Sequence, residues 1–192
     1  MPIDQGIPME KGMADQECMA APLWIFGYGS LLWRADFPWA ERRPASLRGF
    51  ARRFWQASTD HRGTPDAPGR VVTLVEEAPA CCHGAAYRIE ASDAGQVLDQ
   101  LDHRERGGYD RLSIDLEFED GRREGLTYRA SAGNRNYLGP APLDEIAAQV
   151  RTARGPSGHN LEYVVRLADA LRDLGRGDPH VFELERLLQP AD

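Results

Sequence analysis

Strand-like patterns fill the first half of this sequence and helix-like patterns close it, and this order limits the fold more than any single motif does. The clearest pattern is a β-hairpin: apolar and polar residues alternate over 112–118, Asp120-Gly121 supplies a turn, and 126–128 runs back. Because strands and helices do not alternate as in a βαβ series, we expect a mixed α+β domain, for which a partly closed barrel is one arrangement. Further strands are predicted at 23–28, 47–56, 70–75 and 84–89, with a loop at 59–69.

Four helices are predicted from start and stop signals combined with apolar spacing. Ser92 is a good N-cap for a first helix that ends near His103. Pro142 suits the first turn of a second helix, and Gly155 is placed to stop it. The remaining two helices are predicted to follow Ser157 and to span 181–188.

Length and charge exclude several classes of protein. The 192 residues suffice for one well-packed domain but not for two ordinary ones, so we expect residues 23–192 to form a single domain. Residues 1–22 are polar and without pattern, and we expect a disordered tail there. A net charge of −7 argues against nucleic acid as a partner. No apolar run approaches the roughly 20 residues of a membrane span, so no membrane partner is expected.

The cysteines bear on the cellular compartment. Cys18, Cys81 and Cys82 are odd in number, and adjacent cysteines rarely form a disulfide with each other. The amino terminus has no apolar segment of signal-peptide length. Together these features predict a cytoplasmic protein.

The turn after the first predicted strand is a candidate binding site. Tyr28-Gly29-Ser30-Leu31 presents backbone N–H groups that are suited to an anion such as a carboxylate. It lacks the lysine of a phosphate loop and the third glycine of a dinucleotide fingerprint, and taken alone it is more typical of a turn that only ends a strand. Ser30 is disfavoured as a nucleophile, because the glycine that a hydrolase elbow carries two residues later is missing. The histidines show no metal-ligand spacing.

Glu105 lies between two arginines where the first predicted helix gives way to the hairpin. On spacing alone, such a carboxylate is typical of a solvated surface charge. Only a longer set of motifs singles it out.

That set, in its order and separations, closely resembles the ChaC family of glutathione-specific γ-glutamylcyclotransferases, and the resemblance extends over residues 23–188. The motifs are Phe26-Gly27-Tyr28-Gly29-Ser30-Leu31, Arg53-Phe54-Trp55-Gln56, Asp60-His61-Arg62-Gly63, Pro68-Gly69-Arg70-Val71-Val72-Thr73-Leu74, Arg104-Glu105 with Gly107-Gly108-Tyr109, Tyr137-Leu138-Gly139-Pro140-Ala141-Pro142, and Gly155-Pro156-Ser157-Gly158. The sequence departs from the pattern in its amino-terminal extension and in Arg106, neither of which removes a matched functional position.

The resemblance implies a small mixed, partly closed β-barrel with flanking helices and a cofactor-free reaction, in which glutathione becomes 5-oxoproline and Cys-Gly. It implies that Glu105 is the acid-base residue and that Tyr28, Gly29, Ser30 and Leu31 bind the γ-glutamyl group. No metal is implied. We further expect Tyr137 to line the site, and Arg62 or Arg70 to meet the glycyl carboxylate; loop packing for the tyrosine and ion pairs for the arginines are the alternatives.

Two other functions remain open at this point. One is a cyclotransferase for other γ-glutamyl amino acids or amines, although the motifs at 60–63 and 68–74 favour the glutathione-specific branch. The other is a non-catalytic module that binds a γ-glutamyl metabolite, which the turn would serve but which does not need Glu105.

Overall fold

A closed five-stranded barrel forms the body of the protein. The structure is a computed structural model, and it describes residues 22–105 and 108–189. The strands follow one another around the barrel in the order β1-β3-β2-β4-β5. Their bounds are Leu23–Gly27 for β1, Glu41–Ser58 for β2, Gly69–Ile89 for β3, Asp110–Phe118 for β4 and Gly121–Arg129 for β5. The predicted α+β barrel with flanking helices is confirmed, and the barrel is closed where the prediction had it partly closed. The predicted tail, residues 1–22, lies outside the described residues except for its last one.

Two strand contacts of one residue pair each, β2–β4 and β1–β5, close the barrel between the longer antiparallel pairs. β1 pairs along its whole length with β3, and the predicted hairpin β4–β5 pairs from Asp110 opposite Arg129 to Phe118 opposite Gly121. β2 meets β4 at Ser46 opposite Glu117. β5 meets β1 in parallel at Ile25 opposite Leu126, which completes the barrel.

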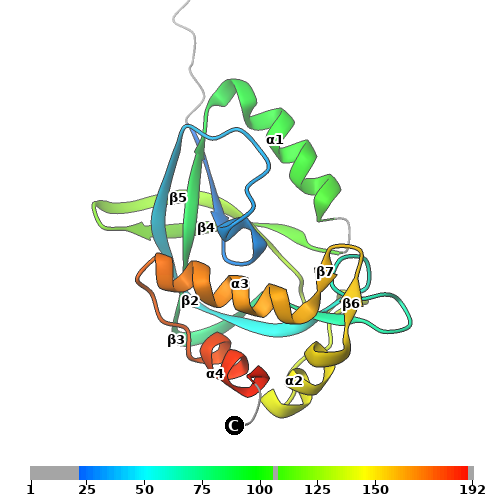
Figure 1. Ribbon diagram of the computed structural model, residues 1–192. Helices are drawn as coiled ribbons and strands as arrows, with labels where there is room; N and C mark the ends of the chain where they lie inside the picture. Colours follow the sequence, from blue (N-terminus) through cyan, green and yellow to red (C-terminus); the bar gives the residue numbers. More distant parts are fainter. Residues whose placement is uncertain (1–21, 106–107, 190–192) are drawn as a thin grey trace, which may run out of the picture.

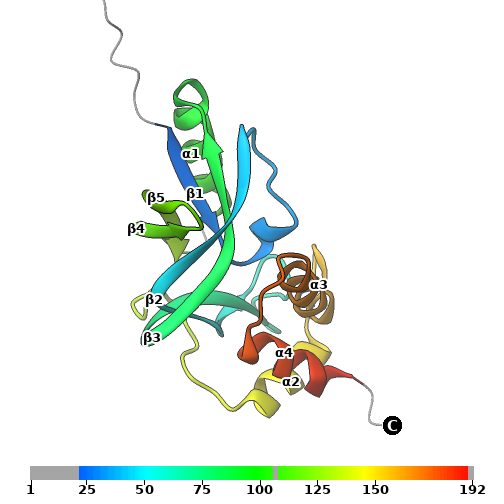
Figure 2. The ribbon, with the colours of Figure 1, turned by 90° about the vertical axis from the view of Figure 1, so that its left-hand side faces the viewer.

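β3 is one long strand where the sequence predicts two, at 70–75 and 84–89. The intervening residues 76–79 are exposed, so the apolar pattern breaks although the strand continues and pairs with β2 at Glu76 and again at Cys81. The register between β2 and β3 shifts between Arg48 and Phe50, at Gly49, whose φ of +82° favours glycine. The long β2–β3 pair thus bends, and it reaches both the barrel and the helices beyond it (Figure 2).

The helices gather at two ends of the molecule. α1 (Ala91–Arg104) lies near one end, whereas α2 (Leu143–Thr152), α3 (Asn160–Asp173) and α4 (Pro179–Leu188) cluster at the other (Figure 1). A short 3-10 helix, η1 (Ser30–Leu32), follows β1, and the two-residue strands β6 (Arg154–Gly155) and β7 (Gly158–His159) pair before α3. Within the described ranges, no helix has both the length and the hydropathy that crossing a bilayer requires.

The predicted helices are all present, with corrected ends. The N-cap of α1 is Glu90 rather than Ser92, and no side chain caps this helix. At α3, the Nδ1 atom of His159 accepts a hydrogen bond from the backbone of Leu161 over 3.2 Å, so a histidine takes the capping role that sequence preference assigns to shorter polar residues. α2 ends at Thr152, before Gly155.

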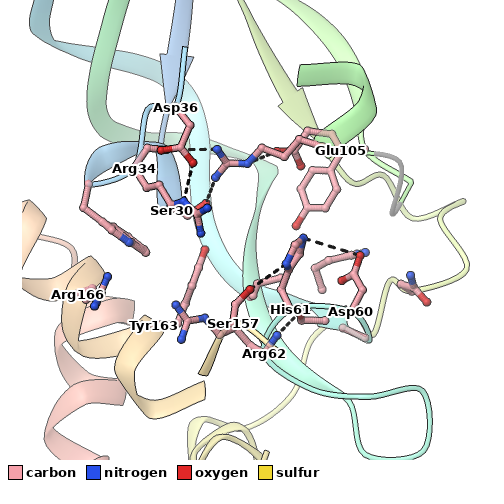
Figure 3. A pocket seen from close by; sticks show the side chains of 18 residues that line it. Ser30, Arg34, Asp36, Asp60, His61, Arg62, Glu105, Ser157, Tyr163 and Arg166 are labelled. Carbon is pink, nitrogen blue, oxygen red and sulfur yellow. Dashed lines mark hydrogen bonds and ion pairs between the residues drawn. The ribbon is translucent and has the colours of Figure 1, made fainter. Parts of the chain in front are cut away.

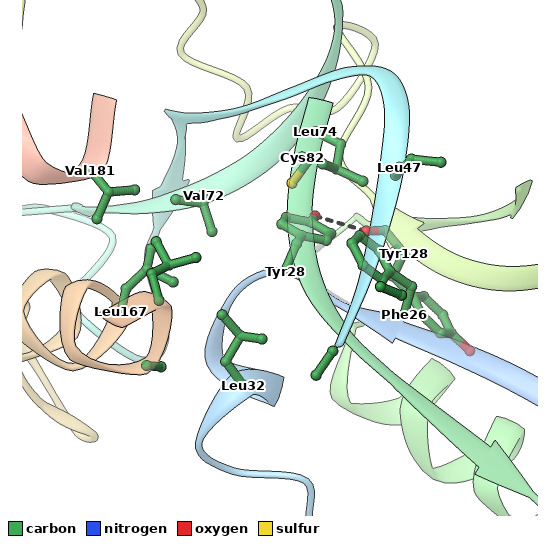
Figure 4. Packing of buried hydrophobic residues seen from close by; sticks show 14 of the residues in the cluster. Phe26, Tyr28, Leu32, Leu47, Val72, Leu74, Cys82, Tyr128, Leu167 and Val181 are labelled. Carbon is green, nitrogen blue, oxygen red and sulfur yellow. Dashed lines mark hydrogen bonds between the residues drawn. The ribbon is translucent and has the colours of Figure 1, made fainter. Parts of the chain in front are cut away.

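One hydrophobic cluster joins the interior of the barrel to the helices. Figure 4 shows Phe26, Tyr28 and Leu74 of the barrel region packed in the same core that extends to Leu167 of α3 and Val181 of α4. Burial of each large apolar side chain in this shared core contributes about 1.5–3 kcal/mol. The helices therefore fix the part of the β2–β3 pair that packs against them. The site described next lies where these two parts meet.

Candidate active site

Two adjoining cavities lie between the turn after β1, the end of α1 and the face of α3. The larger has a volume of about 310 Å3, and the smaller, of about 60 Å3, is lined by the Tyr28–Leu31 turn. The lining of the larger cavity comes from opposite sides, with Ser30, Arg34 and Asp36 facing the group His61, Arg62 and Ser157 (Figure 3). Four residues line both cavities and so mark their junction: Ser30, Glu105, Tyr109 and Tyr163.

The turn is shaped by glycines that leave no room for a side chain. A Cβ at Gly27 would lie 2.6 Å from Leu31 Cβ, and one at Gly29 would lie 3.0 Å from the Tyr163 hydroxyl. Among the described residues, no hydrogen bond is donated by the backbone N–H of Gly29, Ser30 or Leu31. The turn therefore offers three unpaired N–H groups beside the smaller cavity, which suits a carboxylate or a developing oxyanion.

A buried arginine holds this turn from behind. Arg52 is 1% exposed, and its Nε donates to the carbonyl oxygen of Tyr28 over 2.6 Å. Its Nη1 is paired with Asp178 over 2.7 Å, and its Nη2 donates to the carbonyl of His83. Because all sides of the guanidinium are bonded, the position of Tyr28 is fixed to the barrel and to the start of α4.

Glu105 is placed by backbone hydrogen bonds on both sides of it. Its N–H donates to the Leu101 carbonyl over 2.8 Å, which makes it the C-cap of α1, and its own carbonyl accepts from Gly108 and Tyr109 at 3.2 and 3.1 Å. Its carboxylate approaches Arg104, with Nε and Oε1 3.6 Å apart. The side chain thus points into the junction of the two cavities from a rigid backbone.

The surroundings of Glu105 favour its protonated form. Burial, with the charge of Asp60 as a smaller contribution, raises the pKa of this carboxyl, while Arg104 opposes the rise. Its side chain is 21% exposed, so solvent reaches it only in part. A raised pKa moves the proton exchange of a carboxyl toward neutral pH, which suits a general acid-base residue.

Three tyrosines surround this carboxyl. Burial, and then the negative charge of Glu105, raise the pKa of Tyr28 well above its usual range, and burial raises the pKa of Tyr163 to about 12. Tyr109 donates its hydroxyl hydrogen to the Val72 carbonyl over 3.1 Å, and Tyr28 donates to the Tyr128 carbonyl over 2.8 Å. These hydroxyls stay protonated, so the three tyrosines line the cavities as neutral side chains that can form hydrogen bonds.

The arginines predicted to meet the glycyl carboxylate lie in different places. Arg62 lines the larger cavity, where its Nη1 contacts Glu162 at 3.3 Å. Arg70 lines neither cavity: its Nε donates to Gln149 over 2.7 Å and its Nη1 to the Phe54 carbonyl over 3.1 Å. Tyr137, the predicted wall, also lies outside both linings, in a backbone bridge with Gln56.

The fold brings to the site several residues that were not predicted from the sequence. Arg104 and Tyr109 line the larger cavity. Both belong to the same sequence motif as Glu105, and that motif could have pointed to them. Tyr163 and Arg166 reach the cavity from α3, where their spacing is that of ordinary helix positions. Arg166 is exposed and forms no ion pair with any residue in the described ranges, which leaves a cation at the edge of the cavity.

No metal-binding cluster of three or more His, Cys, Asp or Glu side chains occurs in the described part of the chain. The polar groups at the junction and around the larger cavity include the N–H groups of the turn, the carboxyl of Glu105 and several arginines.

Comparison with known proteins finds relatives along nearly the whole chain. The family model described as ChaC-like protein matches residues 23–191. Glutathione-specific gamma-glutamylcyclotransferase 1 from Homo sapiens is 46% identical over 80% of this chain and 71% of its own length. The Danio rerio protein of the same name is 42% identical over 92% and 94%. A crystal structure of a γ-glutamyl cyclotransferase specific to glutathione from yeast superposes with a TM-score of 0.81 at 29% identity, covering 87% of this chain and 95% of that one.

Proposed function

This chain belongs to the ChaC-like protein family, and from that premise we propose that it is a glutathione-specific γ-glutamylcyclotransferase, which converts glutathione to 5-oxoproline and cysteinylglycine. One observation carries the chemical part of the proposal. Glu105, a carboxyl with a raised pKa, stands at the junction of a small cavity lined by the N–H-bearing turn and a larger cavity with several arginines.

The substrate fits these two cavities in one direction. The γ-glutamyl group lies in the smaller cavity with its α-carboxylate at the N–H groups of Gly29, Ser30 and Leu31. The Cys-Gly part lies in the larger cavity, where Arg62 and Arg166 offer cations to the glycyl carboxylate. This arrangement brings the amide bond between the two parts to Glu105. Arg166 replaces Arg70 in our assignment, because Arg166 lines the larger cavity whereas Arg70 lines neither cavity.

The reaction needs a base and then an acid at one place. The α-amine of the substrate is largely an ammonium at neutral pH, and Glu105 takes a proton from it so that the nitrogen lone pair can attack the γ-carbonyl carbon. The new N–C bond forms, the attacking nitrogen gives up a second proton to solvent as it becomes the lactam N–H, the C–N bond to cysteine breaks, and Glu105 returns the proton it took to the cysteinyl nitrogen. The two products contain all the atoms of glutathione. A positioned acid-base group typically contributes about 10²- to 10⁴-fold to the rate.

The turn contributes by holding the γ-glutamyl chain bent. Ring closure needs the amine within reach of the γ-carbonyl, and fixing that geometry removes an entropic barrier worth up to about 7–11 kcal/mol in well-oriented intramolecular reactions. An N–H group of the turn that faces the carbonyl oxygen also stabilises the oxyanion of the tetrahedral intermediate.

Release of 5-oxoproline from glutathione by the purified protein tests the proposal directly. We expect Glu105→Gln to keep the fold and glutathione binding but to lose at least about 100-fold in kcat. Glu183→Gln is the matched control, because Glu183 is an exposed residue of α4 paired with Arg186. Turnover of Glu105→Gln within about twofold of the parent would overturn the role of Glu105.

The alternative functions predict other outcomes of the same assay. A cyclotransferase for other γ-glutamyl compounds would prefer a γ-glutamyl amino acid such as γ-glutamylalanine over glutathione. A binding module would bind glutathione and release no 5-oxoproline. We place the reaction in the cytoplasm, a proposal that the free thiols of Cys81 and Cys82 support.

A further inference from the structure

Asp60 brings a negative charge to a cavity that also holds several arginines. It lines the larger cavity, and its side chain is 60% exposed, so a bound molecule can reach the carboxylate. Within the described ranges no arginine lies at ion-pair distance from Asp60, and its one such contact is His61 Nε2 at 4.0 Å, beyond hydrogen-bond distance (Figure 3). Three arginines of the cavity have acidic partners of their own: Arg34 with Asp36, Arg62 with Glu162 and Arg104 with Glu105.

The backbone on both sides of Asp60 is held in place. The N–H of Arg62 donates to the Ser58 hydroxyl over 2.9 Å, which closes the turn that contains Asp60. His61 is bonded to Ser157 twice: its carbonyl accepts from the Ser157 N–H over 2.9 Å, and its Nδ1 lies 3.1 Å from the Ser157 hydroxyl oxygen. The carboxylate of Asp60 is therefore carried by a fixed segment at the end of β2.

The charge of Asp60 reaches the junction of the two cavities. Burial raises the pKa of Glu105 and of Tyr109, and the negative charge of Asp60 adds to both rises. Both of these residues line the two cavities, whereas Asp60 lines only the larger one. Asp60 thus acts on the junction from the side that we assign to the Cys-Gly part of the substrate.

One nitrogen of glutathione becomes positive on that side during the reaction. The α-ammonium belongs to the γ-glutamyl group, which lies in the smaller cavity. The cysteinyl nitrogen begins as an uncharged amide, but in the tetrahedral intermediate it takes the proton from Glu105 and then has four bonds and a positive charge. As the oxyanion re-forms the carbonyl, the C–N bond breaks, its electron pair stays on the nitrogen, and a neutral amine leaves.

We propose that Asp60 is a second catalytic residue, whose carboxylate stabilises the positive charge that the cysteinyl nitrogen carries as it leaves. This inference rests on the proposed function and on the direction in which the substrate lies. The charge is absent from bound glutathione, so the attraction forms only as the reaction proceeds. An interaction of this kind raises kcat and leaves substrate binding almost unchanged.

The test crosses one substitution in the protein with one change of leaving atom. Asp60→Asn keeps the size of the side chain and removes its charge. The second substrate is the glutathione analogue in which an ester oxygen replaces the cysteinyl nitrogen, because an oxygen leaves without a positive charge. Release of 5-oxoproline is measured for the four combinations, with the uncatalysed cyclisation of the ester subtracted. The pH is kept above the acid limb of the pH–rate profile, so that a changed pKa of Glu105 has little effect.

On glutathione, Asp60→Asn should lower kcat about 10- to 100-fold and keep KM within about twofold of the parent. On the ester, parent and variant should have nearly the same kcat. An equal loss on both substrates would mean that Asp60 acts through Glu105 or through the fold. A rise in KM alone would mean that it binds the uncharged amide, and an unchanged variant would mean that solvent screens its charge. Each of these three results overturns the proposal.

Two further readouts separate this role from a general effect of charge or stability. Asp66→Asn is the matched control, because Asp66 is an exposed aspartate of the same loop that lines neither cavity, and it should keep kcat on both substrates. Asp60→Asn should keep the melting temperature of the parent. If the parent releases no 5-oxoproline from glutathione, the proposed function fails and this inference falls with it. An active parent with any of the three contrary results overturns the role of Asp60 alone.

Discussion

Arg104 Nη2 donates a hydrogen bond to Ser30 Oγ over 2.8 Å, and this bond ties the end of α1 to the turn after β1. The same guanidinium reaches Glu105 Oε1 with its Nε at 3.6 Å. One arginine thus sets the distance between the two parts of the site that the reaction needs, the binding turn and the acid-base carboxyl.

The Ser30 hydroxyl is expected to position rather than to react. Ser30→Ala removes the bond to Arg104 but keeps the backbone N–H of the turn, so we expect kcat/KM on glutathione to fall about tenfold. A nucleophilic serine would instead lose several orders of magnitude. Steady-state release of 5-oxoproline distinguishes the two, and a loss above about 1000-fold would return Ser30 to the list of nucleophiles.

The acid side of the pH–rate profile should report Glu105. Because burial raises its pKa, kcat/KM should decline with falling pH at a higher pH than an ordinary glutamate would give. The charge of Arg104 opposes that rise, so Arg104→Met should move the acid limb to still higher pH. Arg186→Met, which removes an exposed charge on α4, is the control and should leave the limb in place. A downward shift in Arg104→Met would contradict the assignment.

Glu105 should also reduce stability at neutral pH. The folded state holds its proton more tightly than the unfolded chain, so the parent loses stability as the pH rises from the unfolded pKa of about 4.5 through the folded one. Glu105→Gln has no such loss. We expect its melting temperature to match the parent below about pH 4.5 and to exceed it at pH 7 to 8. A melting temperature below that of the parent at neutral pH would show that the carboxylate stabilises the fold.

The glycines offer a matched pair of substitutions. Gly29→Ala puts a Cβ 3.0 Å from the Tyr163 hydroxyl and 3.1 Å from Val72 Cγ2, so the turn must move and kcat/KM should fall. Gly95→Ala, in α1, meets no atom within 4 Å and should stabilise the protein by about 0.5–1 kcal/mol with unchanged activity. Thermal unfolding and the 5-oxoproline assay measure both. Full activity in Gly29→Ala would show that the turn tolerates displacement.

The Arg52–Asp178 pair should dominate the stability of the region behind the turn. Asp178→Ala leaves the Arg52 guanidinium buried without its counter-ion, which should cost about 3–5 kcal/mol. Asp178→Asn should cost less, because its side-chain oxygen can still cap α4 at the Val181 N–H. Glu183→Ala, which breaks an exposed ion pair on the same helix, should change the unfolding free energy by less than about 1 kcal/mol. Denaturant unfolding ranks the three.

Local sequence patterns predicted most of the helices and strands. They missed the features that depend on pairing between strands far apart in the chain. The hairpin β4–β5 is explicit in its alternation and its Asp-Gly turn, and the helices follow from their apolar spacing. The continuity of β3 through 76–80 was missed, because most of these residues are exposed and break the apolar pattern, while the strand is held by its pairs with β2 at Glu76 and again at Cys81. The short strands β6 and β7 carry no detectable period at two residues each.

The sequence by itself determined the α+β class, the hairpin, the turn at 28–31 and, through motifs, the candidate Glu105. Only the tertiary structure decided which cations share the cavity with that carboxyl, because Arg62, Arg166 and Arg70 look alike in a chain and differ only in what surrounds them. It also decided that Asp60 faces the same cavity with no arginine of the described residues at ion-pair distance. Periodicity is a property of neighbouring residues, whereas a cavity is made by segments that are far apart in the chain and meet only when the core packs.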